Sequence, residues 1–97
     1  MEPCVTSSRT LAKYQRKVRV FYPLTNGSIV LRTEADWNHN LEPEASVDGT
    51  MFEFTVASER PFLYFKPCLI DGSELHWSAG MNNLAVLSEP GPRDIYP

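Results

Sequence analysis

The chain has 97 residues, a length that suits one small domain. Hydrophobic residues make up 42% of it and charged residues 22%, a mixture that excludes a disordered chain. The net charge of −3 argues against nucleic-acid binding, which needs a basic surface. Five of the nine Lys and Arg residues precede position 20, and we interpret them as a solvent-exposed basic segment that leads into the first strand.

The chain begins with a polar, mixed segment of fifteen residues, for which we expect a flexible conformation. The pattern changes to a period of two over residues 16–22. Val18, Val20 and Tyr22 fall on one face of this stretch, and Lys17, Arg19 and Phe21 fall on the other. Such alternation is typical of a half-buried strand.

Five further strands are predicted from alternating or apolar runs that lie between turn signals. These strands span residues 28–33, 50–56, 61–70, 74–78 and 83–87. Asn26-Gly27 predicts a hairpin turn, and Asp71-Gly72 is a second turn signal. Pro67 has no N–H to donate, so it marks an edge or a bulge. Residues 34–49 are predicted to be a long polar connection.

About six short strands without a predicted helix favour a sandwich over a βαβ arrangement. We predict an all-β, immunoglobulin-like antiparallel β-sandwich of about six or seven strands, spanning residues 16–88. A flexible segment (1–15) precedes it, and a C-terminal linker or tail (89–97) follows, which indicates a piece of a longer protein. The predicted core takes alternate residues of 62–70 together with Val18, Val20, Ile29, Leu31, Phe52, Phe54, Val56, Leu84 and Val86.

Cys4 and Cys68 are interpreted as free thiols, with Cys68 as a small core residue, and a disulfide between them is the alternative. No Cys/His cluster predicts a metal site, and we expect no cofactor. The N-terminus lacks the apolar segment of a signal peptide, and no apolar run is long enough to cross a membrane. We therefore expect a cytoplasmic protein that does not bind membranes.

The motifs of a catalytic domain are missing from the sequence. It has neither a G-x-S-x-G elbow nor a glycine-rich loop that opens a helix. Most carboxylates fall in predicted turns, where they are usually solvated. His39 and His76 are interpreted as solvent-facing residues. Because no base and orienting partner can be named, we expect no catalytic residues.

Two tryptophans suggest binding instead. Trp37 is flanked by Asp36 and Asn38 in a polar stretch, and an aromatic side chain in such a place often meets a partner. An indole can cover the C–H face of a sugar while neighbouring polar groups bond its hydroxyls. The alternative is that Trp37 folds back over the core. Trp77 alternates with Leu75, so both are predicted in the core if Leu75 is.

The order of these elements resembles the starch- and glycogen-binding modules, carbohydrate-binding module families 20 and 48. These families include the glycogen-binding domain of the AMP-activated kinase β subunit. The resemblance runs from about Val18 to Leu87, most of the chain, and the corresponding stretches read EADWN, MFEFTV, LYFKPCLIDG, ELHW and MNNLAV. The resemblance implies that Trp37 and Trp77 stack on sugar and that Asn82 bonds its hydroxyls. It also implies that Lys66 is the lysine found beside a tyrosine in these modules.

The chain departs from this pattern at four places. The spacing from Asp71-Gly72 to Trp77 is longer than in the kinase subunit, and the stretch from Trp77 to Asn82 is shorter. Ala35-Asp36 replaces the phenylalanine-asparagine pair that precedes the first tryptophan, and Phe65 separates Tyr64 from Lys66.

We therefore expect a non-catalytic module that binds an α-glucan, a starch- or glycogen-type polysaccharide or oligosaccharide. The predicted binding residues are Trp37, Trp77, Asn82, Lys66 and Asn38. The alternative is an interaction domain, without sugar binding, that docks on a following enzyme domain such as a hydrolase or esterase. A catalytic domain is the third hypothesis.

Overall fold

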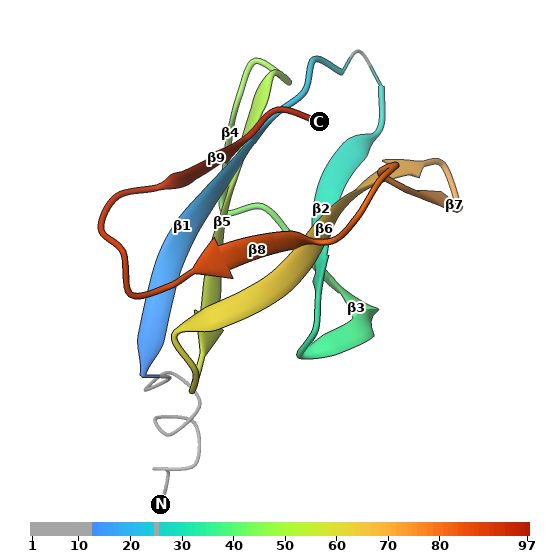
Figure 1. Ribbon diagram of the computed structural model, residues 1–97. Helices are drawn as coiled ribbons and strands as arrows, with labels where there is room; N and C mark the ends of the chain where they lie inside the picture. The colour runs from blue at the N-terminus through green and yellow to red at the C-terminus, as the bar shows by residue number, and fades with distance from the viewer. Residues whose placement is uncertain (1–12, 25) are drawn as a thin grey trace, which may run out of the picture.

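The computed structural model describes residues 13–24 and 26–97, and none of these residues is helical. Two sheets pack face to face (Figure 1), so the prediction of an all-β sandwich is confirmed. The described residues contain no helix that could cross a membrane. The strands are β1 (Tyr14–Phe21), β2 (Ser28–Thr33), β3 (Asp36–Leu41), β4 (Ala45–Val47), β5 (Met51–Ser58), β6 (Phe62–Asp71), β7 (Glu74–Trp77), β8 (Asn83–Val86) and β9 (Arg93–Ile95).

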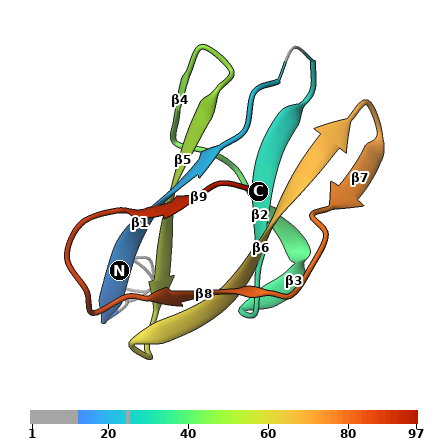
Figure 2. The same ribbon diagram turned by 45° about the horizontal axis from the view of Figure 1, so that its top comes forward.

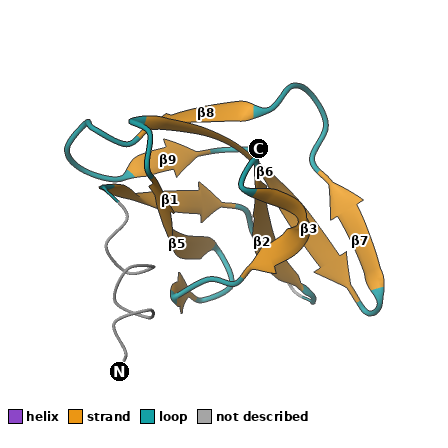
Figure 3. Ribbon diagram, turned by 90° about the horizontal axis from the view of Figure 1, so that it is seen from below, coloured by secondary structure: helices purple, strands orange, loops and turns teal. Residues whose placement is uncertain are grey.

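The first sheet has the order β4-β5-β1-β9, in which β1 runs antiparallel to β5 and parallel to β9. The second sheet has the order β3-β2-β6-β7, and β8 also pairs with β6. One edge of β6 pairs with β2. The other edge pairs with β8 over its first half and with β7 over its second half. Figures 2 and 3 show β7 at the side of the molecule away from β5, and Figure 2 shows β8 passing across β6 toward β1.

The structure explains why a strand can hold Pro67. Pairing of β6 with β7 ends at Cys68, and pairing with β8 begins at Phe65. The carbonyl of Pro67 accepts a hydrogen bond from the N–H of Ser78 at 3.1 Å. In an antiparallel ladder the N–H and C=O of one residue point to the same side. The Pro67 nitrogen, which has no hydrogen to donate, therefore faces the gap between the β7 and β8 pairings, where no ladder bond is lost.

The turn after β1 differs from the predicted hairpin. β1 and β2 belong to different sheets, so the connection between them crosses from one sheet to the other. Gly27 is nevertheless required there. Its φ is +86°, and a Cβ at this position would lie 2.4 Å from the carbonyl oxygen of Ile70. The second turn signal, Asp71-Gly72, does connect paired strands, β6 and β7.

Replacing Gly27 with alanine is expected to destabilise the fold more than replacing Gly72. Both glycines have positive φ, which costs an L-residue about 1–2 kcal/mol. A Cβ at Gly72 meets nothing within 4 Å, whereas a Cβ at Gly27 meets backbone. Urea unfolding should therefore show a loss of about 1–2 kcal/mol for Gly72→Ala and at least roughly 1 kcal/mol more for Gly27→Ala. Equal losses would contradict the close approach of Gly27 to β6.

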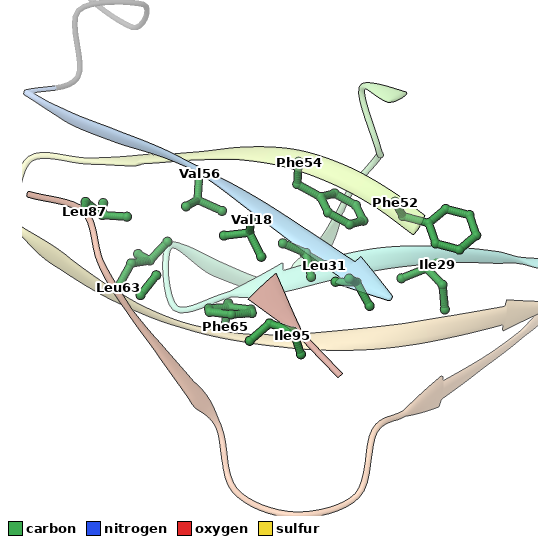
Figure 4. Packing of buried hydrophobic residues seen from close by; sticks show 12 residues of the cluster. Val18, Ile29, Leu31, Phe52, Phe54, Val56, Leu63, Phe65, Leu87 and Ile95 are labelled. Carbon is green, nitrogen blue, oxygen red and sulfur yellow. The ribbon is translucent and has the colours of Figure 1, made fainter. Parts of the chain in front are cut away.

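The core lies between the two sheets and is formed by alternate residues of their strands (Figure 4). Period-two alternation places every second side chain on the inner face. Removing these side chains from water is the main favourable contribution to folding. Seven residues of the predicted core are confirmed as buried: Val18, Val20, Ile29, Leu31, Phe52, Phe54 and Val56.

The predicted core positions in β8 are wrong by one residue. Leu84 is 38% exposed and Val86 is half-buried, whereas Ala85 and Leu87 are buried. The register explains the difference, because Ala85 lies opposite the inward-facing Leu63 of β6. A shift of one residue moves every side chain of a strand to the other face.

The predicted polar connection over residues 34–49 contains two strands, β3 and β4. Both are edge strands, and most of their residues are at least partly exposed, so neither has the buried face that alternation would reveal. Backbone pairing places Leu41 of β3 opposite Leu31 of β2.

The ends of the chain also differ from the expected boundaries. Residues 93–95, within the expected tail, form β9, and Ile95 joins the core. β1 begins at Tyr14. Residues 1–12 of the expected flexible segment, which include Cys4, lie outside the described residues.

Candidate functional site

The two tryptophans lie side by side on the outer surface of the second sheet. Their ring centroids are 6.2 Å apart and their planes are inclined by 55°. Trp77 lies opposite Cys68 in the β6–β7 ladder, and Trp37 is the second residue of β3. Trp77 is 45% exposed and Trp37 is half-buried. Two large aromatic side chains that are distant in sequence therefore form one partly exposed surface.

The alternation with Leu75 left open the prediction that Trp77 is buried in the core, and that prediction is wrong. Leu75 and Trp77 do share a face, but it is the outer one. Leu69 packs against the core, and its partner across the ladder is His76. The residues on either side of His76 therefore point away from the core. His76 itself is exposed, as predicted.

Two cationic side chains lie on the same surface. Arg32 follows the inward-facing Leu31, so it points outward, and Lys66 lies directly opposite it in the β2–β6 ladder. Cys68 lies two residues further along β6 and shares this face. We call this surface the tryptophan face and define it by Arg32, Trp37, Lys66, Cys68 and Trp77.

Arg32 connects the parts of the tryptophan face. Its Nε donates a hydrogen bond to Oδ1 of Asn40 at 2.6 Å, and its Nη1 donates to the carbonyl oxygen of Trp37. Its guanidinium carbon lies 5.4 Å from the ring centroid of Trp77, within the range of a cation–π interaction. One side chain of β2 thus contacts β3 on one side and the indole of β7 on the other.

Cys68 is buried, as predicted, and its thiol is free, but it lies on the outer face of the second sheet. Val30 lies opposite it and is also buried. Burial raises the pKa of the Cys68 thiol, while the charges of Arg32 and Lys66 act in the opposite direction. His76 points to the other face of the sheet, so its imidazole is not placed to take the thiol proton.

The remaining predicted site residues lie around this face. Lys66 donates a hydrogen bond from Nζ to the carbonyl oxygen of Gly80 at 2.5 Å, which ties the β7–β8 connection to β6. Asn82 is exposed at the end of that connection. Asn38 is exposed beside Trp37, and its N–H donates to Oδ1 of Asp36 at 2.9 Å. The structure therefore gathers Trp37, Trp77 and Lys66 closely and leaves the two asparagines at the periphery.

Sequence reasoning missed Arg32 and Asn40 as members of one cluster. Alternation along SIVLRT places Arg32 on the face opposite to Leu31, which is the available signal. Its proximity to Trp77 depends on the register of three strands, which a single sequence does not supply.

A second exposed apolar group lies on the same sheet, at the other end of β6. Tyr64 is opposite Leu84, and Phe62 is two residues away on the same face. All three side chains are more than a third exposed. The carboxylate of Glu34 borders this group, accepting a hydrogen bond from the N–H of Tyr64 at 2.9 Å and one from Arg60 at 2.6 Å. These two donors hold the pKa of Glu34 below its ordinary value.

A cavity of about 320 Å³ opens beside Trp77 and is lined mostly by apolar groups, among them Tyr22, Leu69 and Ala79. His76 lines it as well. Over residues 13–24 and 26–97, no three His, Cys, Asp or Glu side chains lie close enough together to hold a metal ion.

Comparisons of the chain with protein-family models, with curated proteins and with solved structures found no match.

Proposed function

We propose that this domain is a non-catalytic carbohydrate-binding module and that the tryptophan face is its binding surface. The observation that carries the proposal is the 6.2 Å separation of two partly exposed indoles on one side of a sheet. Sugars present C–H groups on one face and hydroxyls at the rim. An indole can cover the C–H groups. Lys66 can donate to the hydroxyls, and Asn38 and Asn82 can donate to them or accept from them.

The inclination of the indoles favours an α-glucan of the starch or glycogen type. Their planes meet at 55°, so the two rings form a bent surface. An α-1,4-linked glucan curves along its length, and successive sugar rings change direction. A β-1,4-linked glucan is a flat ribbon that matches coplanar rings. We therefore propose that the domain prefers the curved chain.

The resemblance to carbohydrate-binding module families 20 and 48 supports the same ligand, since it implies two tryptophans at one site. We also propose that the sandwich is immunoglobulin-like and that the protein acts in the cytoplasm.

Titration with maltoheptaose, read by tryptophan fluorescence, tests this function. The chain has two tryptophans, and both belong to the tryptophan face, so the signal reports on this surface alone. We expect a saturable change with a dissociation constant of about 1 mM or somewhat lower, because few groups are ordered at such a small site. Cellohexaose, the flat counterpart, should bind more weakly. No response at millimolar maltoheptaose would contradict the proposal.

A second candidate function is docking on a following enzyme domain, such as a hydrolase or esterase. The exposed group of Phe62, Tyr64 and Leu84 favours it, because a contiguous apolar surface often meets a protein partner. Hydrogen exchange of this domain alone and within its natural full-length protein distinguishes the two functions. Docking predicts new protection at β6 and β8 without sugar, whereas a freely linked binding module predicts none.

A further inference from the structure

The charges of the tryptophan face point to a more specific ligand than a neutral glucan. Arg32 and Lys66 lie directly opposite each other between β2 and β6. Both charges act on the thiol of Cys68, whose ladder partner is Trp77. Two positive charges therefore lie next to the two indoles, in a chain whose net charge is −3.

The hydrogen bonds of these two residues fix their positions without neutralising them. Arg32 donates to the amide oxygen of Asn40 and to the carbonyl of Trp37, and Lys66 donates to the carbonyl of Gly80. All three acceptors are uncharged. Among the described residues, no carboxylate lies within 4 Å of either cation.

Three other cations of the domain each lie beside a carboxylate. Lys17 lies 2.7 Å from Glu44, Arg19 lies 3.0 Å from Asp94, and Arg60 lies 2.6 Å from Glu34. Their charges are compensated within the fold, whereas those of the tryptophan face are available to a ligand.

We propose that the tryptophan face binds a saccharide that carries an anionic group, a phosphate or a carboxylate. The sugar ring lies against the indoles, and the anion lies between Arg32 and Lys66. A guanidinium group matches the planar geometry of a carboxylate or phosphate edge, and an ammonium group adds a point charge. This inference rests on the proposed carbohydrate binding and names the class of sugar that the face selects.

The test compares a neutral oligosaccharide with oligosaccharides that carry an anionic group. Maltoheptaose is titrated beside maltoheptaose that carries one phosphate, an oligogalacturonide supplies the carboxylate, and inorganic phosphate supplies the anion alone. We expect at least one anionic sugar to bind about tenfold more tightly than maltoheptaose at low salt. Raising the ionic strength to about 0.2 M should reduce this ratio, because salt screens exposed charges.

Two variants that each remove one positive charge test whether the preference for anionic sugars comes from the tryptophan face. Lys66→Gln should lower the ratio of anionic to neutral affinity by several-fold. Lys17→Gln removes the same charge from the outer face of the first sheet and should leave the ratio unchanged.

The outcomes separate this inference from the proposed function. Equal binding of anionic and neutral sugars would overturn the charge preference and leave carbohydrate binding intact. Binding of neither sugar would overturn both. Binding of inorganic phosphate as tightly as the phosphorylated sugar would reveal a simple anion site and overturn the preference for a charged saccharide.

Discussion

Replacing Phe65 with alanine is expected to lower the free energy of unfolding by about 3–5 kcal/mol. Phe65 is fully buried in β6, between β2 on one side and β8 on the other. The truncation removes a whole ring from the space between the sheets and leaves a cavity. A small domain has a total stability of about 5–15 kcal/mol, so this one change should remove a large share of it.

Phe62→Ala is the matched control, since it deletes the same ring from the same strand. Phe62 is 41% exposed and lies 5.1 Å from the guanidinium of Arg60. Its loss should cost about 1 kcal/mol or less. Chemical denaturation followed by tryptophan fluorescence measures both variants. If the two variants lost similar stability, the assignment of inner and outer faces to β6 would be wrong.

Replacing Trp77 with alanine is expected to weaken maltoheptaose binding about tenfold or more. Stacking of a planar base on an aromatic side chain contributes about 1–3 kcal/mol, and we take the sugar–indole contact as comparable. Each 1.4 kcal/mol corresponds to a tenfold change in affinity. The double variant of Trp37 and Trp77 should show no detectable binding. Isothermal titration calorimetry measures these affinities without depending on tryptophan fluorescence.

Tyr96→Ala provides the control for removing an exposed aromatic residue. Tyr96 is 73% exposed and stacks on Phe21 of the first sheet, with ring centroids 4.9 Å apart. Its loss should leave sugar binding unchanged. Circular dichroism checks that each tryptophan variant keeps its strands. A folded Trp77→Ala variant with undiminished affinity would remove Trp77 from the binding site.

The sequence was most informative where strands have one buried face. In the middle of β1 and β5, hydrophobic residues alternate with polar ones, so the pattern located both the strands and the core residues Val18, Val20, Phe52, Phe54 and Val56. Such strands lie inside a sheet and bury one face, so their sequences alternate between apolar and polar residues.

The edge strands β3 and β4 and the register of β8 could not be predicted from the sequence, for physical reasons. β3 and β4 are held mainly by backbone pairing at a sheet edge, which leaves little hydrophobic pattern. In β8, the short run NLAVL has apolar residues on both faces, so only the pairing of Ala85 with Leu63 decides which face is inner.

The candidate site was predictable in its residue types and not in its assembly. Trp37 and Trp77 were singled out by their surroundings and by the family resemblance. β3 and β7 are the two edge strands of this sheet, so the rings come within 6.2 Å only because both indoles reach over the outer face of β2 and β6, which is a property of the topology. Arg32 joins them for the same reason, because β2 lies beside β3 in that sheet.

Two-dimensional NMR spectra of the backbone amides and the two indole N–H groups, recorded during a maltoheptaose titration, test the central claim most directly. A single Trp37→Phe variant assigns the indole signals. We predict that both indole signals shift with one dissociation constant, together with the amides of Arg32 and Lys66. Amides of the first sheet, such as that of Arg19, should not move. Unchanged indole signals at millimolar sugar, or shifts confined to the first sheet, would contradict the assignment of the tryptophan face as a carbohydrate-binding surface.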